Sequence, residues 1–222
     1  MYDPTTERGQ WRAKLKDLLR KAVIIPVVTI DRMADAVPLA EALVAGGIHA
    51  IEITLRTPVA FEAARAIMRE VPSTIVGIGT ILTREDLGRA RDLGAAFALS
   101  PGTTPALLEA AAETDLAFVP GVQTASEVMA AMAAGFEILK FFPAVPAGGI
   151  AGLRALAGPF PKAGFCPTGG IGEKDLSAWL SEPNVLAVGG SWIAPAKDIA
   201  AGSWPEITAR AAQVSKLIKT EQ

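Results

Sequence analysis

The stretch Ile24-Ile25-Pro26-Val27-Val28-Thr29 decides between two α/β folds. Its apolar and β-branched residues predict a buried strand. An open doubly wound sheet needs a glycine-rich phosphate loop after its first strand, whereas Asp31-Arg32 follow closely here and no such loop is present. We therefore predict a closed (β/α)8 barrel, the TIM-barrel fold, in preference to the open sheet.

Strand and helix signals alternate from this stretch to the end of the chain. Segments rich in alanine and leucine separate the strand candidates, and glycines mark the ends of several predicted helices. Thr83-Arg84-Glu85-Asp86 and Thr124-Ala125-Ser126-Glu127 have the form of capping boxes, which begin helices. Eight strands alternating with helices match the barrel. The strand candidates are Val23–Thr29, Ala50–Thr54, Ile75–Thr80, Phe97–Ser100, Ala117–Gly121, Ile138–Phe142, Gly164–Pro167 and Val185–Gly189.

A helix is predicted ahead of the first strand. Residues 11–20, with Trp11, Leu15, Leu18 and Leu19, have the pattern of an amphipathic lead-in helix that covers one end of the domain. A chain of 222 residues suits one domain, because α/β barrels commonly exceed about 200 residues as a single unit. We therefore predict a single (β/α)8 domain over residues 1–222.

The composition argues against several classes of partner. The formal net charge is −2, and no basic block interleaved with aromatic residues points to nucleic acid. No apolar run approaches a membrane span, and the polar residues 1–10 lack a signal-peptide core. The single cysteine, Cys166, cannot form an internal disulfide, which predicts a cytoplasmic location.

Metal chemistry is also unexpected. The single histidine, His49, excludes zinc sites built on two or three histidines. It is predicted at the amino-terminal end of its strand, where a structural role is expected. A carboxylate-bound magnesium stays open, although no acidic cluster points to one. We expect neither a metal nor a cofactor.

One lysine is placed in an apolar strand, Ile138-Leu139-Lys140-Phe141-Phe142, which Pro143 ends. On the pleat, Ile138, Lys140 and Phe142 share one face. Burial disfavours a charged ammonium, and a neutral amine is a nucleophile toward carbonyls. Lys140 is therefore a candidate nucleophile. The alternative is a lysine that extends to solvent or pairs with a carboxylate.

Polar residues also stand where the second and third predicted strands end, and barrel active sites lie at these ends. Glu52 and Thr54 share a face of one strand, and Arg56 follows just beyond. A carboxylate in an apolar strand is rarely buried without a task or a partner. Glu52 is therefore a candidate acid/base, and a structural ion pair with Arg56 is the alternative. Small residues near Thr80 leave room for a ligand.

Glycine pairs follow the last two predicted strands, in Thr168-Gly169-Gly170 and in Gly189-Gly190-Ser191. Paired glycines let backbone N–H groups approach an anion, and a hydroxyl adds a donor. Barrels often bind phosphate between these two loops. We predict a phosphate site here. The alternative is that the glycines only permit tight turns.

The chain resembles the 2-dehydro-3-deoxy-6-phosphogluconate (KDPG) and 4-hydroxy-2-oxoglutarate (KHG) class I aldolases of the Entner–Doudoroff type. The resemblance extends from about Val23 through Ile193–Pro195 and beyond. The chain departs from it at Ile78, where alanine is expected, and at Val145-Pro146-Ala147, where a more polar segment is expected. The motifs that carry the resemblance are Leu43-Val44-Ala45-Gly46-Gly47, Glu52-Ile53-Thr54-Leu55-Arg56-Thr57, Val76-Gly77-Ile78-Gly79-Thr80, Ser100-Pro101-Gly102, Lys140-Phe141-Phe142-Pro143-Ala144, Phe165-Cys166-Pro167-Thr168-Gly169-Gly170 and Gly189-Gly190-Ser191-Trp192.

The resemblance implies a role for each site residue. Lys140 would form a Schiff base with a 2-oxo-3-deoxy sugar acid phosphate, and Glu52 would act as acid/base. The products would be pyruvate and glyceraldehyde 3-phosphate, with additional cleavage of 4-hydroxy-2-oxoglutarate. Family members are commonly homotrimers without a metal requirement. The remaining implied residues are Arg56, Thr80, Pro101, Phe142 and Thr168 for substrate binding, and Gly169, Gly170, Gly190 and Ser191 for phosphate binding.

Three alternatives stay open. A barrel phosphosugar isomerase or epimerase would use the same phosphate loops, but it would want a carboxylate pair or metal ligands. A non-catalytic phosphosugar-binding barrel would not need Glu52 and Lys140 facing one cavity. Within the aldolases, a 2-dehydro-3-deoxy-6-phosphogalactonate aldolase is the alternative, and the sequence leaves the preference among substrates open.

Overall fold

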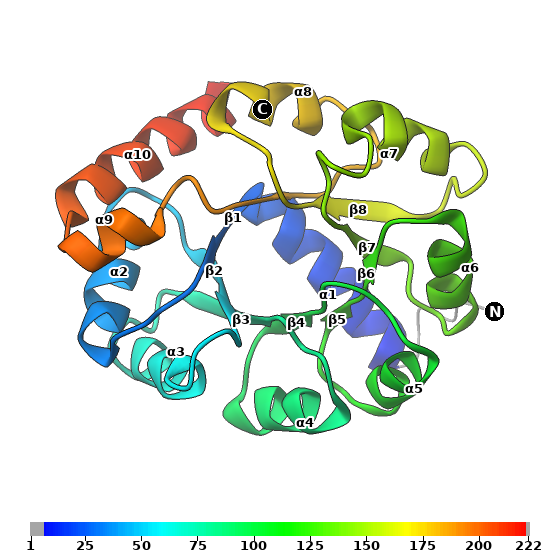
Figure 1. Ribbon diagram of the computed structural model, residues 1–222, viewed down its shortest axis with the longest axis horizontal. Helices are drawn as coiled ribbons and strands as arrows, with labels where there is room; N and C mark the ends of the chain where they lie inside the picture. The colour runs from blue at the N-terminus through cyan, green and yellow to red at the C-terminus, as the bar shows by residue number, and fades with distance from the viewer. Residues whose placement is uncertain (1–6, 221–222) are drawn as a thin grey trace.

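The computed structural model describes residues 7–220, with side chains for residues 14–217, and it places parallel strands inside a ring of helices (Figure 1). The elements in chain order are α1 (Glu7–Ala22), β1 (Ile24–Val28), α2 (Met33–Ala45), β2 (Ala50–Thr54), α3 (Ala60–Glu70), β3 (Ile75–Gly79), α4 (Arg84–Leu93), β4 (Phe97–Leu99), α5 (Pro105–Glu113), β5 (Phe118–Val119), β6 (Gly121–Val122), α6 (Ala125–Ala133), β7 (Ile138–Phe141), α7 (Gly149–Ala157), β8 (Gly164–Pro167), the 3₁₀ helix η1 (Glu173–Asp175), α8 (Leu176–Leu180), β9 (Val188–Gly190), α9 (Ala196–Ala201) and α10 (Trp204–Thr220).

The strands form two hydrogen-bonded sheets, in the orders β5-β4-β3-β2-β1-β9 and β6-β7-β8. Every pair within them is parallel. The larger sheet curls around the interior (Figure 1), and isolated bridges link Phe165 to Val185 and Thr168 to Gly189. The predicted α/β class with parallel strands is confirmed. The predicted complete barrel of eight strands is confirmed only in part, because the hydrogen bonding divides the strands between two sheets.

The predicted strand Ala117–Gly121 is divided at Pro120 into β5 and β6. Proline has no backbone N–H to donate to a neighbouring strand, but the Pro120 carbonyl accepts a hydrogen bond from the Lys140 N–H at 2.9 Å. As a result β5 pairs with β4 and β6 pairs with β7, so Pro120 lies where the two sheets meet. The last predicted strand is also displaced, since β9 begins at Val188 and Val185 forms only the bridge to Phe165.

The helix signals are confirmed where the capping boxes predicted them. Thr83 and Asp86 begin α4 with reciprocal side-chain hydrogen bonds, and Thr124 and Glu127 begin α6 in the same way. Gly94 ends α4 in the left-handed conformation, with φ of 84°, which glycine adopts without steric cost.

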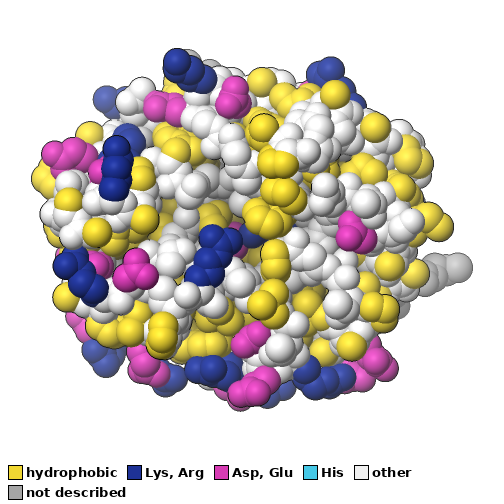
Figure 2. All heavy atoms as spheres, viewed as in Figure 1, with side chains coloured by type: hydrophobic (Ala, Val, Ile, Leu, Met, Phe, Trp, Pro, Cys, Tyr) yellow, Lys and Arg dark blue, Asp and Glu magenta, His cyan; other side chains and the backbone are white. Residues whose placement is uncertain are grey.

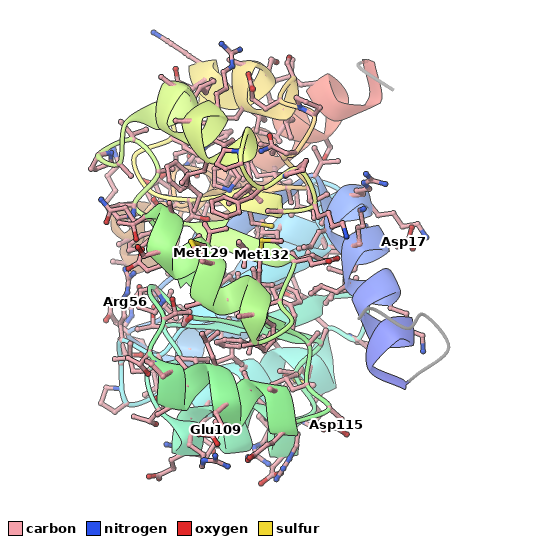
Figure 3. All side chains as sticks on the ribbon, turned by 90° about the vertical axis from the view of Figure 1, so that its right-hand side faces the viewer. Asp17, Arg56, Glu109, Asp115, Met129 and Met132 are labelled. Carbon is pink, nitrogen blue, oxygen red and sulfur yellow. The ribbon has the colours of Figure 1, made fainter. Side chains whose placement is uncertain are left out.

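The lead-in helix is confirmed as α1, and the Trp11 side chain lies outside the described side chains. Its Leu15 and Leu19 are buried against interior residues that include Ile25, Phe97 and Cys166. Figure 3 shows α1, marked by Asp17, at one end of the strands and Arg56 at the opposite end. The helix therefore closes the amino-terminal end of the interior and leaves the carboxyl ends of the strands open to a ligand. Within the described part of the chain, no helix is both long and apolar enough to cross a membrane.

Candidate active site

The centre of the candidate site is a buried pair formed by Lys140 and Glu52. Lys140 Nζ donates a hydrogen bond to Glu52 Oε1 at 2.8 Å, and the two side chains are 6% and 2% exposed. Lys140 lies on β7 and Glu52 on β2, so the contact spans the two sheets. Removing one partner of such a buried pair leaves an uncompensated charge and typically costs about 3–5 kcal/mol. The structure therefore selects Lys140, and not Arg56, as the partner of Glu52.

Apolar groups and a thiol surround the lysine. Lys140 Nζ lies 5.5 Å from the centroid of the Phe142 ring. Cys166 is the register partner of Lys140 on the adjacent strand β8. Burial raises the pKa of the Cys166 thiol to about 12, although the nearby Lys140 acts in the opposite direction. Cys166 therefore stays protonated at neutral pH and serves as a core residue, because the nucleophilic form of cysteine is the thiolate.

The Glu52 carboxylate rests against the backbone of Gly79, the last residue of β3. A Cβ atom added at Gly79 would overlap Glu52 Oε1 and would lie 2.7 Å from Glu52 Cδ and Cγ. No side chain larger than hydrogen fits there without moving the carboxylate. Gly79 is a positioning residue that sequence analysis did not assign, although it belongs to one of the motifs that analysis singled out.

We expect Gly79→Ala to lower kcat by about 10²-fold, because a displacement of about 1 Å in a catalytic group has an effect of that size. The measurement is steady-state kinetics together with a thermal melt. Gly88→Ala is the matched control, since a Cβ at Gly88 meets nothing within 4 Å. A normal kcat in a folded Gly79→Ala variant would show that Glu52 does not need its observed position.

The other predicted substrate residues follow the carboxyl ends of the strands. Arg56 is exposed after β2, Thr80 directly follows β3, and Pro101 lies in the turn after β4. Thr80 has φ of 62°, which is strained for a β-branched residue and is typical of functional sites. Among the described residues, neither Arg56 nor Thr80 forms a hydrogen bond or ion pair with the buried pair. On the face of the molecule that carries the carboxyl ends of the strands, positive side chains lie beside a band of hydrophobic side chains near the centre (Figure 2).

The structure brings the two glycine loops together. Thr168 is buried and forms a bridge with Gly189, and a Cβ at Gly189 would overlap the Thr168 hydroxyl. Gly169 and Gly170 have φ of 103° and 81°, so both need the conformational freedom of glycine. The backbone N–H groups of Gly169, Gly170 and Ser191 donate no hydrogen bond to any described residue. These donors are free to bind an anion.

The single histidine and two of the other lysines are exposed to solvent. His49 is exposed just before β2, with Nδ1 3.3 Å from the Ser73 carbonyl oxygen. Lys162 precedes β8 and Lys197 lies on α9, and both are exposed. Within the described residues, no cluster of three or more histidine, cysteine, aspartate or glutamate side chains could hold a metal ion.

A family model described as "KDPG and KHG aldolase" matches residues 15–210. The chain belongs to this family. Among its relatives, the KHG/KDPG aldolase of Escherichia coli K12 is 44% identical over 198 residues, which are 89% of this chain and 93% of the relative. The 2-dehydro-3-deoxy-phosphogluconate aldolase of Dickeya dadantii is 46% identical over 201 residues, 90% of this chain and 94% of the relative.

A solved member of the KDPG and KHG aldolase family has a closely similar structure. The crystal structure of KDPG aldolase from Legionella pneumophila, with pyruvate captured as a covalent carbinolamine intermediate, has a TM-score of 0.87 and 44% identity. The match covers 90% of this chain and 97% of the Legionella chain. The family resemblance predicted from the sequence is therefore confirmed.

One further residue beside the glycine loops was not assigned by sequence analysis. Val145, in the segment after β7, donates its backbone N–H to the Gly169 carbonyl at 3.0 Å, and its side chain lies against Gly170. It is 45% exposed. The sequence feature that could have identified Val145 is the departure of Val145-Pro146-Ala147 from the family pattern.

Proposed function

We propose that this protein is a Schiff-base aldolase that cleaves 2-dehydro-3-deoxy-6-phosphogluconate to pyruvate and glyceraldehyde 3-phosphate. The buried contact of 2.8 Å between Lys140 Nζ and Glu52 Oε1 carries the proposal. This contact supports the proposal because it joins the two side chains that we propose as nucleophile and acid/base. Relatives named as aldolases for this substrate support the choice of reaction.

In the proposed reaction, Lys140 acts as the nucleophile. A proton passes from Lys140 Nζ to Glu52, and the neutral amine attacks C2 of the substrate to form a carbinolamine. Loss of water, with Glu52 returning the proton to the leaving oxygen, gives an iminium. Positioned proton transfer of this kind typically contributes about 10²–10⁴ in rate.

The iminium then accepts the electron pair of the C3–C4 bond. Glu52 takes the proton of the C4 hydroxyl, the bond breaks, and glyceraldehyde 3-phosphate leaves. The remaining enamine takes this proton back from Glu52 at C3, and water hydrolyses the resulting iminium to release pyruvate and Lys140. Atoms and charges balance with water as the only co-reactant.

A cleavage assay on three substrates tests the proposal. The phosphogluconate derivative, its phosphogalactonate epimer and 4-hydroxy-2-oxoglutarate would each be supplied to protein dialysed against EDTA. We expect the highest kcat/KM for the phosphogluconate derivative, and no loss of activity on EDTA treatment, because Lys140 supplies the electron sink. A loss that zinc or magnesium restores, or no cleavage of any of the three, would contradict the proposal.

We assign substrate phosphate to the free N–H groups of Gly169, Gly170 and Ser191, with Gly190 beside them. Arg56 and Thr80, with Pro101, Phe142 and Thr168, are proposed to hold the rest of the substrate. Arg56 is the one cation in this set and suits the carboxylate, because a guanidinium can bind it with two hydrogen bonds. This assignment is supported by the position of these residues, which all lie at or just after the carboxyl ends of the strands.

We expect Ser191→Asp to raise KM for the phosphorylated substrate roughly 10- to 100-fold, because like charges at close range disfavour one another. Cleavage of unphosphorylated 4-hydroxy-2-oxoglutarate should change little, since Lys140 and Glu52 lie on other strands. Ser73→Asp, exposed at the other end of the strands, is the matched control. Equal losses on both substrates would indicate a damaged turn, and no loss on either would argue against a phosphate site.

We also propose that the two sheets act as one closed (β/α)8 barrel in a single domain. The contact of Lys140 with Glu52 and the bridges from β8 toward β9 support closure of the barrel.

A homotrimer is proposed on the exposed hydrophobic side chains Leu82 and Met129, which are 60% and 61% exposed. Light scattering would test this. A cytoplasmic location is proposed on the single buried cysteine.

A further inference from the structure

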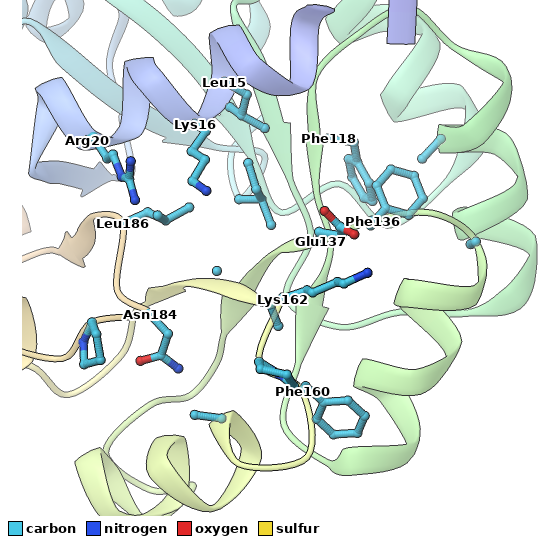
Figure 4. A pocket seen from close by; sticks show the side chains of 18 of the residues that line it. Leu15, Lys16, Arg20, Phe118, Phe136, Glu137, Phe160, Lys162, Asn184 and Leu186 are labelled. Carbon is cyan, nitrogen blue, oxygen red and sulfur yellow. The ribbon is translucent and has the colours of Figure 1, made fainter. Parts of the chain in front are cut away.

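A cavity lies at the amino-terminal end of the strands, away from the Lys140–Glu52 pair. Its volume is about 550 Å³, within the range of small-molecule sites. Ile138, the first residue of β7, belongs to its wall, whereas Lys140, two residues later on the same strand, reaches Glu52. The apolar part of the wall includes Leu15, Ala112, Phe118, Phe136, Phe160 and Leu186 (Figure 4).

The charged side chains around this cavity are mostly positive. Lys16 and Arg20 extend toward it from α1, and Lys162 and Glu137 come from the segments before β8 and β7 (Figure 4). None of the four forms an ion pair with another described residue. Three cations against one carboxylate favour an anionic ligand.

An unsatisfied donor lies in the same wall. Asn184 Nδ2 is buried and has no hydrogen-bond partner among the described residues. The Asn184 backbone is fixed, because its carbonyl accepts a hydrogen bond from the Phe165 N–H at 2.7 Å. Buried donors are nearly always paired in proteins, so this one calls for an acceptor that the described protein does not supply.

We propose that this cavity binds a small anionic amphipath, a carboxylate with an apolar body such as a medium-chain fatty acid. Because Nδ2 has almost no accessible surface in the structure, the Asn184 side chain turns on binding so that Nδ2 donates to the carboxylate. The carboxylate lies near Lys16 and Arg20, while the apolar body packs against the phenylalanine side chains. Neither a sugar phosphate nor a neutral alcohol fits as well. The first has no apolar body, and the second lacks the charge.

Decanoate is the probe, titrated calorimetrically below its micelle concentration into the full chain. We expect one site, and no comparable binding of decanol. The double variant Lys16→Gln/Arg20→Gln should weaken binding roughly tenfold or more, since about tenfold corresponds to one modest polar interaction. Both residues are exposed on α1, so the fold should persist. Lys197→Gln, on α9, is the matched control and should bind normally.

Asn184→Leu separates a binding role from a structural one. Removal of an unpartnered buried donor should leave Tm unchanged or higher, and decanoate binding should still weaken. Decanoate is titrated into protein without pyruvate or any sugar acid, so this result does not depend on the proposed aldolase activity. No binding, binding unaffected by both variants, or equal binding of decanol would each overturn the proposal.

Discussion

Replacing Lys140 with methionine should lower kcat by about 10⁴-fold or more, the scale seen when an enzyme loses its covalent nucleophile. In wild-type protein, pyruvate followed by borohydride should leave one adduct on Lys140, because reduction fixes the imine that the amine forms. Peptide mass mapping identifies the labelled residue. An isomerase, an epimerase or a binding protein with this fold would give no adduct.

Two controls make this result specific. Lys162→Met and Lys197→Met remove exposed lysines and should leave activity and labelling intact. Lys140→Met also leaves the Glu52 carboxylate buried without a partner, and such a loss typically lowers stability by about 3–5 kcal/mol. The double variant Lys140→Met/Glu52→Gln removes that charge and should recover much of the lost Tm while staying inactive. Label on Lys162 or Lys197, or activity in the double variant, would contradict the assignment of Lys140.

The strand pattern allowed both central residues to be predicted from the sequence. Apolar strands with one ionisable residue identify Lys140 and Glu52, because a buried charge in such a strand needs a task or a partner. The partner itself could not be deduced. Arg56 lies near Glu52 in the chain, whereas Lys140 is 88 residues away, and only the folded arrangement of β2 and β7 brings Lys140 within 2.8 Å.

Other features depend on packing that the sequence pattern does not encode. The role of Gly79 follows from the position of the Glu52 side chain on the neighbouring strand, which strand signals do not reveal. The division at Pro120 follows from hydrogen bonding to strands on either side. The cavity beside α1 is lined by segments that are far apart in the sequence, from α1 to the residues before β9, so no local motif predicts it.

Replacing Glu52 with glutamine should lower kcat by about 10²–10⁴-fold, the usual contribution of a positioned acid/base. Glutamine keeps nearly the same size, and its amide oxygen can still accept a hydrogen bond from Lys140 Nζ. It cannot take a proton from the amine or from the C4 hydroxyl of the substrate. Formation of the imine and cleavage of the C3–C4 bond should therefore both slow, while the side chain at position 52 keeps its packing against Gly79.

Two measurements distinguish this catalytic role from a structural one. A thermal melt should show that Glu52→Gln remains folded, and single-turnover labelling with pyruvate and borohydride should show a slower approach to the same final adduct on Lys140. Glu41→Gln, exposed on α2, is the matched control for loss of a carboxylate and should behave as wild type. If Glu52→Gln keeps full kcat, or unfolds while Glu41→Gln does not, then Glu52 serves only to hold Lys140, and the proton acceptor for the C4 hydroxyl must be sought elsewhere at the carboxyl ends of the strands.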